Sequence, residues 1–504
     1  MSSTLSSILL IPVEITYAIC AISLFLIGTN FLVSVIIYIR NRKKGWSLKT
    51  PQPPDEWPPV TIQLPIYNER YLAERILKAI TQFDYPREKL EIQVLDDSTD
   101  WTTNLLIGLV ENYRKQGVDI KYLHRVDRYG FKAGNLTFGL KYAKGEFTAI
   151  FDADFIPPRN WLKRTIPFFN DPKVGFVQTR WDHINFAHNM ITKMAGLTLD
   201  GHFVVEQVAR STAGLIMGFN GSGGIWRTAA IDSAGGWQWD TMTEDVDMTF
   251  RSQFAGWEGR YLVNLRSPAE VPQELDDFKL QQYRWCKGTA QVALKLMGQL
   301  PKAKMPFKKK VFGMIHLLSY LTFPLAILLL LLVLPVSLWS QSFLRLFWWA
   351  GLASIGPVLL FVLARTEHAP RLIDRLKIMP SEFLIGVGIS LVCALSVISG
   401  GVHRGKGGTF IRTTRADPRI GRAYDSGKRR ILDLFILGEY AMGTYLVLSL
   451  IVLWSTSGPY LLPWLGGSAL GFFLVASISL HDRLKKGIKH HVKHEEGSDV
   501  IPIV

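Results

Sequence analysis

The stretch Thr148-Ala149-Ile150-Phe151-Asp152-Ala153-Asp154 decides the fold of this chain of 504 residues. Its apolar part predicts a buried strand, and two carboxylates follow where the carboxyl end of a sheet opens into a crevice. Carboxylates at i and i+2 point to the same side of an extended chain, so Asp152 and Asp154 could jointly hold Mg2+ or Mn2+ and, through the ion, a diphosphate. The alternative is a solvated turn after a strand.

The composition points to a membrane protein. The chain is 48% hydrophobic and has a formal net charge of +15. Its basic residues gather beside hydrophobic segments, at 40–44, 308–310, 428–430 and 483–486, which is the positive-inside pattern. We therefore expect a lipid bilayer and no nucleic acid as a partner. The three cysteines are too few and too dispersed for a disulfide framework or a zinc site.

Apolar, basic and α/β-patterned segments predict eight regions along the chain. They are an N-terminal transmembrane anchor (1–45), a Pro-rich linker (46–59), an α/β domain (60–286), an interfacial helix region (287–310), two transmembrane helices (311–364), an interfacial or re-entrant segment with a basic loop (365–430), two more transmembrane helices (431–481) and a basic cytosolic tail (482–504).

The segment 383–400 needs a separate interpretation. It is apolar enough to cross a membrane, but basic stretches on both sides of it favour the cytoplasm. We therefore expect it to be interfacial or re-entrant and buried against protein. This arrangement leaves five crossings, an external N-terminus and a cytosolic α/β domain.

Within 60–286, hydrophobic runs alternate with charged helical segments, which predicts a mixed α/β domain with a doubly wound, mostly parallel sheet. Strands at 60–65, 91–95 and 120–123 precede the stretch quoted above, and a helix is expected through Ile80. The strands deliver polar residues at their carboxyl ends. Carboxylates from two strands, together with Lys132, could therefore converge on one nucleotide-sugar in a single crevice.

Three further polar motifs follow in order: Phe219-Asn220-Gly221-Ser222-Gly223-Gly224, Thr243-Glu244-Asp245 and Gln281-Gln282-Tyr283-Arg284-Trp285. Each has a plainer interpretation. The glycine run is compatible with an ordinary loop, Thr243 with a helix N-cap followed by carboxylates in the first turn, and Arg284-Trp285 with an interface anchor. Their joint order on one chain favours a functional site.

This series of motifs resembles the membrane-embedded processive family 2 glycosyltransferases of the cellulose synthase superfamily. It is most similar to the plant cellulose-synthase-like A and C proteins, which make mannan, glucomannan or the glucan backbone of xyloglucan. The resemblance spans roughly Val60 to Gly288. Its further anchors are Gln178-x-Arg180-Trp181, Glu206-Gln207, Trp226-Arg227 and Gly235-Gly236-Trp237. It implies a nucleotide-sugar-binding domain of the GT-A type, inserted between transmembrane helices.

The resemblance also implies roles for the motifs. Asp96 and Asp97 would hold the nucleoside, and Asp154, with Asp152 nearby, would hold the metal ion that neutralises the leaving diphosphate. Asp245 would be the general base that takes the proton of the acceptor hydroxyl.

The other candidate residues fall into three groups. Glu244 and Arg284 would act beside the general base. The donor would be bound by Lys132, Asp152, Gln281, Arg284 and Arg415. The acceptor would lie against the indole of Trp285, close to Phe219, Asn220 and Gly221.

The loop 407–415 resembles the gating loop of the superfamily, whose usual pattern is Phe-x-Val-Thr-x-Lys. Here Arg412 replaces the valine and Arg415 replaces the lysine. An arginine fork suits a diphosphate at least as well as lysine does. The alternative is a basic loop that binds lipid headgroups.

The resulting hypothesis is an inverting, metal-dependent, processive hexosyltransferase that polymerises a β-linked glycan from UDP-glucose or GDP-mannose. The growing glycan would be the acceptor and would leave through the membrane helices. The enzyme would reside in the plasma membrane, or in the Golgi of a eukaryote, and an accessory export subunit or a homo-oligomer is compatible with this class. One alternative is a transferase that adds one or a few sugars to a membrane lipid, and another is a scaffold with an inactive domain.

Overall fold

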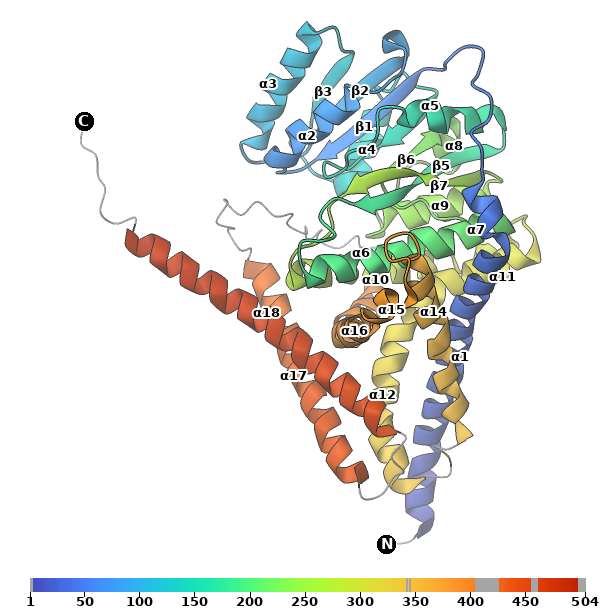
Figure 1. Cartoon of the computed structure of the whole chain (residues 1–504), viewed down its shortest axis with the longest axis vertical. Helices are drawn as coiled ribbons and strands as arrows, with labels where there is room; N and C mark the ends of the chain where they lie inside the picture. The colour runs from blue at the N-terminus through green and yellow to red at the C-terminus, as the bar shows by residue number, and fades with distance from the viewer. Residues whose placement is uncertain (1–2, 341–342, 344–345, 404–425, 455–460, 497–504) are drawn as a thin grey trace.

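The computed structural model describes residues 3–340, 343, 346–403, 426–454 and 461–496. An α/β domain forms one end of the molecule and a stalk of long helices forms the other, with the N-terminus at the far end of the stalk (Figure 1). The chain enters along α1 (Ser3–Trp46), builds the α/β domain, and returns to the stalk for its last third.

A seven-stranded sheet is the centre of the α/β domain. Its strands are β1 (Val60–Ile66), β2 (Leu90–Asp96), β3 (Ile120–His124), β4 (Phe147–Ile150), β5 (Val174–His183), β6 (Gly224–Arg227) and β7 (Glu258–Ala269). The order is β3-β2-β1-β4-β6-β5-β7, and β6 runs antiparallel to β4 and β5 whereas the other pairs are parallel. The predicted mixed, mostly parallel sheet is confirmed.

Helices cover both faces of the sheet because successive strand residues point to opposite faces. On one face, α2 (Arg70–Ile80), α3 (Thr102–Lys115) and α5 (Trp161–Thr165) share a core with Ile92 and Val94 of β2. On the other, α4 (Phe131–Leu140), α8 (Thr228–Ser233) and α9 (Glu244–Phe254) share a core with Leu95, the next residue of the same strand. The helix expected through Ile80 is α2.

Three helices lie between the sheet and the stalk. They are α6 (Met190–Asp200), α7 (Gln207–Ala213) and α10 (Leu275–Leu296). The boundary predicted between residues 286 and 287 falls within α10, which continues without a break. Residues of its second half, including Gly288, Thr289 and Val292, are buried by protein, because α9, α11 (Phe307–Leu318) and α16 (Met379–Val402) pack around it.

Five helical segments of the described chain are long and apolar enough to cross a membrane: Ile11–Trp46, Phe307–Trp339, Leu372–Val402, Ile431–Trp454 and Leu462–Lys485. Four of them coincide with predicted crossings. Among the described residues of the second crossing predicted within 311–364, the apolar helix α14 (Ile355–Ala364) is ten residues long and follows a 3-10 turn at Trp348–Ser354.

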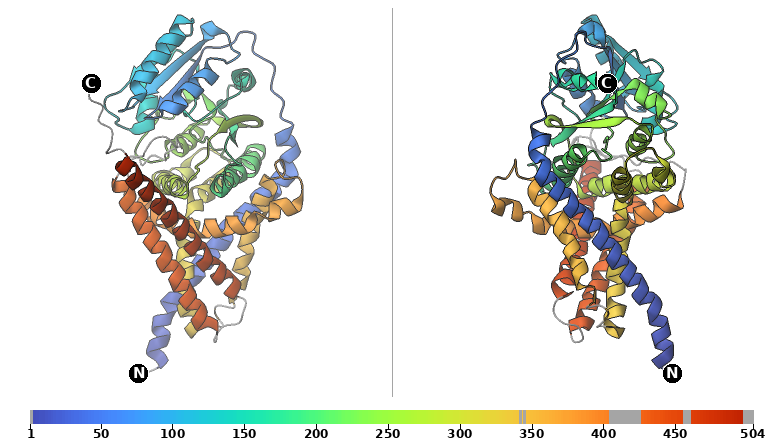
Figure 2. Two further views of the ribbon diagram at one scale, coloured as in Figure 1. Left: turned by 60° about the vertical axis from the view of Figure 1, so that its left-hand side comes forward. Right: turned by 90° about the vertical axis from the view of Figure 1, so that its right-hand side faces the viewer.

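The remaining segment, Leu372–Val402, is the one expected to be buried against protein. Its main helix, α16, lies across the stalk, whereas α12 (Thr322–Trp339), α17 (Ser426–Trp454) and α18 (Leu462–Glu496) run along it (Figure 2). Of its most apolar stretch, 61% is buried inside the protein, the largest share among the five segments. It packs on α10, α12 and α18.

A buried ion pair joins α10 to the last two stalk helices. Lys279 Nζ of α10 donates to Glu439 Oε2 of α17 at 2.8 Å and to Ser479 Oγ of α18 at 2.9 Å. The side chains of Lys279 and Glu439 are both fully buried. Since an uncompensated buried charge is costly, the pair fixes α10 relative to α17 and α18.

Candidate active site

The polar ends of three parallel strands meet at one edge of the sheet. In the register of β1 and β2, Ile66 lies opposite Asp96, so the segment after Ile66 lies beside Asp97. The strand β4 ends at Ile150 on the other side of β1, and Asp152 and Asp154 follow it. This edge is where ligands bind in open α/β sheets.

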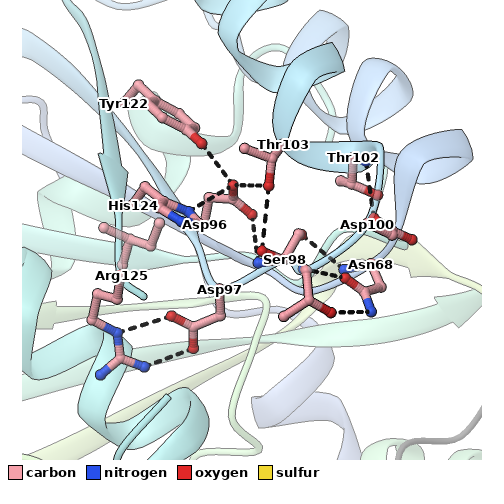
Figure 3. A network of polar contacts seen from close by, with 12 residues as sticks. Asn68, Asp96, Asp97, Ser98, Asp100, Thr102, Thr103, Tyr122, His124 and Arg125 are labelled. Atoms are coloured by element: carbon pink, nitrogen blue, oxygen red, sulfur yellow. Dashed lines mark hydrogen bonds and ion pairs between the residues drawn. The ribbon is translucent and has the colours of Figure 1, made fainter. Parts of the chain in front are cut away.

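Asp96 is the centre of a closed hydrogen-bond network (Figure 3). Its fully buried carboxylate accepts from the Thr103 hydroxyl at 3.0 Å, from the Tyr122 hydroxyl at 2.8 Å and from the Ser98 backbone N–H at 2.8 Å. His124 Nδ1 lies 3.1 Å from the same carboxylate. These partners account for both oxygens, so in this structure Asp96 orders the loop after β2.

Asp97 forms a bidentate ion pair with Arg125, at 2.8 Å from Nε and 2.6 Å from Nη2 (Figure 3). Burial raises the pKa of Asp97, and the guanidinium opposes that rise. Arg125 Nη2 also donates to the backbone carbonyl of Phe131 at 3.0 Å. Because Phe131 begins α4, the Asp97–Arg125 pair positions the next residue, Lys132.

Lys132 joins the D-x-D stretch to the glycine run. Its Nζ donates to Asp152 Oδ1 at 2.5 Å and to the carbonyl oxygen of Gly221 at 2.9 Å. The backbone N–H of Asp152 in turn donates to Ser222 Oγ at 2.8 Å. The motifs around residues 132, 152 and 221 therefore form one cluster.

Glu244 and Asp245 enter this cluster from the first turn of α9. A Cβ atom placed on Gly221, whose φ is +79°, would lie 3.1 Å from Asp245 Oδ2, so the absence of a side chain there lets the carboxylate approach. Thr243 precedes the helix as predicted, but its hydroxyl makes no capping hydrogen bond.

The charges in this cluster shift one another's proton affinity. Removal from water raises the pKa of Asp245 to about 7, and the Glu244 carboxylate adds to the rise while Lys132 opposes it. The pKa of Glu244 is raised for the same leading reason. Burial alone would lower the pKa of Lys132, but the Asp152 and Glu244 carboxylates raise it above its ordinary value. A carboxyl group poised near neutral pH is suited to general-base chemistry.

The helix α10 contributes Arg284 to the cluster. Burial lowers the pKa of Arg284 to about 10, and carboxylates that include Asp277 and Glu244 oppose this effect, so Arg284 stays charged at neutral pH. Gly288 lies one helical turn further on. A Cβ atom at Gly288 would lie 2.5 Å from Thr243 Cγ2 and 2.8 Å from the Thr243 nitrogen, so the glycine lets α10 approach the start of α9.

Asp152 and Asp154 fit a hard divalent cation by their chemistry. Their side chains supply carboxylate oxygens and are 33% and 3% exposed, respectively. Within the described ranges, no group of three or more His, Cys, Asp or Glu side chains could hold a metal ion by itself. Mg2+ is usually bound by one or two carboxylates together with substrate phosphates and water. The pair therefore suits an ion that arrives with a diphosphate.

Other predicted site residues lie in the protein interior. Phe219 is 1% exposed and packs in an aromatic core with Phe176 and Trp226. Trp285 is partly buried against the same core, and Gln281 is 6% exposed. Arg415 and the whole gating-like loop 407–415 lie outside the described residues.

A series of hydrogen bonds that the sequence motifs did not predict connects Asn220 to His202 and Glu206. Asn220 Nδ2 donates to His202 Nε2 at 3.0 Å, and His202 Nδ1 lies 3.1 Å from Glu206 Oε2. Asn220 Oδ1 also accepts from Gln207 Nε2 at 2.9 Å. His202 and Glu206 lie in a π-helical turn, Gly201–Glu206, of a kind frequent at functional sites.

Comparisons with known proteins identify the class to which this fold and cluster belong. Residues 61–205 match the model of glycosyl transferase family 2, and residues 147–363 match that of glycosyl transferase family group 2. The two matches together reach from residue 61 to residue 363, and this region is similar to family 2 glycosyltransferases of the cellulose-synthase-like type. The expected resemblance is thereby confirmed.

Two plant relatives illustrate this assignment. Glucomannan 4-beta-mannosyltransferase 2 of Arabidopsis thaliana is 40% identical over 262 residues, which cover 51% of this chain and 49% of the relative. Probable glucomannan 4-beta-mannosyltransferase 7 of Oryza sativa subsp. japonica is 37% identical over 354 residues, which cover 68% of this chain and 59% of the relative. The chain thus spans about half the length of the curated relatives it matches.

A solved structure shares the fold. It is a mannosyltransferase from Pyrobaculum calidifontis in complex with GDP-Man and Mn2+, with a TM-score of 0.54 and 21% sequence identity. The match covers 77% of this chain and 98% of that one. It supports the predicted GT-A-type architecture.

Proposed function

We propose that this glycosyltransferase builds a β-linked mannan or glucomannan backbone from GDP-mannose by an inverting, processive reaction. The observation that carries the proposal is the convergence of Asp245, Lys132, Asp152 and Arg284 at the carboxyl edge of the sheet, with the pKa of Asp245 raised to about 7. The choice of mannose follows from the names of the plant relatives and from the GDP-Man bound to the solved neighbour.

In the proposed reaction, Asp245 accepts the proton of the acceptor hydroxyl as its oxygen attacks C1 of the donor sugar. The bond from C1 to the diphosphate breaks on the opposite face, so an α-linked donor gives a β-glycoside and no covalent sugar intermediate forms. Lys132 and Arg284 place positive charge beside the departing diphosphate. Asp152 and Asp154 would hold a Mg2+ or Mn2+ ion, which when bound supplies further charge to stabilise that group.

The acceptor would reach Asp245 along the start of α10, where Trp285 and Gly288 follow Arg284. We propose that Asn220, through its bonds to His202 and Gln207, keeps the carbonyl of the neighbouring Gly221 in place for Lys132. The α/β domain would face the cytosol, because the basic cluster at 40–44 follows the anchor. The product would leave through the stalk helices.

The test is donor turnover by the full chain in lipid nanodiscs. GDP-mannose and UDP-glucose are offered separately with Mn2+ or Mg2+, and the product is sized before and after digestion with β-mannanase or β-glucanase. We expect a large, mannanase-sensitive product from GDP-mannose. A small product that extracts into organic solvent would show a lipid glycosyltransferase instead.

A base variant with a matched control tests the role of Asp245. Asp245→Asn should lower kcat by about 10^2- to 10^4-fold, the usual contribution of a general base. Asp232→Asn removes the same charge from an exposed position on α8 and should leave kcat unchanged. Equal turnover by both variants would refute the assignment.

A further inference from the structure

A basic cleft lies beside the loop that follows the D-x-D stretch, and its lining includes neither Lys132 nor Asp245. Its volume is about 630 Å3. Its walls come from the second half of α2, the loop 156–160, α5, and the ends of β5 and β7. Its charged lining residues are Arg75, Lys78, Arg159, Arg164, Arg266 and Asp182. Five cationic side chains therefore face one carboxylate.

Two of these cations are already neutralised by carboxylates. Arg75 pairs with Glu270 at 2.6 Å, and Arg266 pairs with Asp182 at 3.2 Å and with Glu367 at 3.4 Å.

Three cations lack such a partner among the described residues. Arg159 donates to the amide oxygen of Gln82 at 2.9 Å, and Arg164 donates to the backbone carbonyl of Asn264 at 3.2 Å. Lys78 is exposed and forms no ion pair within the described part of the chain. By contrast Lys163, next to Arg164 but outside the cleft, pairs with Asp84 at 2.6 Å. These three cationic side chains could therefore bind an anionic ligand.

All lining residues of the cleft belong to the α/β domain, between residues 75 and 268, and none belongs to a segment that could cross a membrane. A ligand in the cleft therefore contacts this domain alone, which favours a water-soluble ligand over a lipid headgroup.

The cleft is in direct contact with the proposed metal site. Arg75 Nη2 donates to the backbone carbonyl of Asp154 at 3.1 Å, while its Nη1 is bound by Glu270. The loop 156–160 that lines the cleft begins two residues after Asp154, and Ile156 N–H is held by the Pro268 carbonyl at 2.8 Å. An anion that attracted Arg75 would weaken the hydrogen bond from Arg75 to the backbone carbonyl of Asp154.

We propose that this cleft is a second, regulatory site for a soluble ligand that carries a di- or triphosphate group. The guanidinium groups of Arg159 and Arg164 would donate hydrogen bonds to phosphate oxygens, and the ammonium group of Lys78 would add a positive charge. Occupancy would be transmitted to Asp154 through Arg75. Binding itself is independent of the proposed function, whereas the effect on turnover rests on it.

The binding test uses inorganic pyrophosphate and the full chain in nanodiscs of zwitterionic lipid, with divalent metal chelated. Calorimetry measures affinity, and hydrogen exchange locates the protected segments. We expect saturable binding that protects 75–82 and 156–164, and at least tenfold weaker binding in Lys78→Glu/Arg164→Glu. The control Lys141→Glu/Lys173→Glu makes the same charge change at two exposed lysines outside the cleft and should bind as the parent does.

Further arms separate the cleft from the donor site and from lipid. Lys132→Met removes a donor-site cation and should leave the protection of 156–164 intact. Repeating the titration in nanodiscs that contain anionic lipid should not displace pyrophosphate. The proposal is overturned if binding is not saturable, if the control weakens it equally, if Lys132→Met abolishes the protection, or if anionic lipid competes. Loss of turnover alone would bear on the proposed function and not on the cleft.

Discussion

Replacing Glu244 by glutamine should let the enzyme work at lower pH. The pKa of Asp245 is raised from an ordinary value of 3.8 to about 7, first by its removal from water and second by the Glu244 carboxylate. An opposite charge at close range moves a carboxyl pKa by about 1 to 3, and we take the lower end of the same size, about 1, for the like charge of Glu244 because burial is the larger cause here. That change corresponds to about 1.4 kcal/mol.

The sign follows from the proposed role of Asp245. A general base acts when it is deprotonated, so kcat/KM should rise with pH through the pKa of the free enzyme's base. The midpoint of this rise should lie near 7 in the parent enzyme and near pH 6, roughly 1 lower, in Glu244→Gln. Lys132→Met should move the midpoint the opposite way, because the ammonium group holds the pKa of Asp245 down.

The assay follows nucleoside diphosphate release at donor concentrations well below KM across the pH range, in nanodiscs at constant ionic strength. Asp240→Asn is the control, since that carboxylate is 40% exposed and pairs with Lys295 rather than contributing to the pKa of Asp245. A midpoint that stays in place or rises in Glu244→Gln would refute the reasoning, as would an equal fall in Asp240→Asn.

Three other predictions follow from the same structure. Gly288→Ala should lower kcat and should reduce the free energy of unfolding by about 1 to 3 kcal/mol, because its methyl group would meet the Thr243 backbone. The control Gly298→Ala, which has no atom within 4 Å of the added methyl group, should change neither quantity. Thermal unfolding and turnover measure both effects, and equal behaviour of the two variants would contradict the close approach of α10 to α9. Lys279→Met should lower the free energy of unfolding by about 3 to 5 kcal/mol, because it leaves the buried charge of Glu439 uncompensated. The double variant Lys279→Met/Glu439→Leu should recover most of this loss. A double variant no more stable than the single variant would argue against a paired charge. Chelation of divalent ions should abolish turnover and Mn2+ or Mg2+ should restore it, measured by donor hydrolysis or transfer, and full activity in chelator would remove the proposed metal role from Asp152 and Asp154.

Local sequence signals predicted the elements that build the site. The strands around Ile62, Val94 and Ala149 are short apolar runs that end in polar residues, and both patterns depend only on neighbouring residues. The meeting of Asp152 with Lys132 could be expected because carboxyl ends of parallel strands share an edge. The start of α9 at Glu244 was visible from the carboxylates in its first turn.

Features that depend on tertiary packing were not predictable in the same way. The π-helical turn that brings His202 to Asn220 has no signature in the run of residues 201–206, although the polar pair Glu206-Gln207 in an apolar helix was a usable hint. The pairing of Asp97 with Arg125 joins two loops that only the sheet order brings together. The hydropathy of 383–400 likewise shows that this segment is apolar, but it does not predict that α10 packs on it.

The path of α10 determines the smallest fragment that could retain the site. The same helix carries Arg284 and Gly288 at the cluster, and five residues before Arg284 it places Lys279 against Glu439 and Ser479 of the stalk. A fragment cut after the sheet would keep the residues around Asp152 but lose the packing that holds Arg284 beside them. The catalytic residues and the stalk helices therefore have to be expressed together. A movement of α17 or α18 would also shift α10 and, with it, the residues that would contact the acceptor.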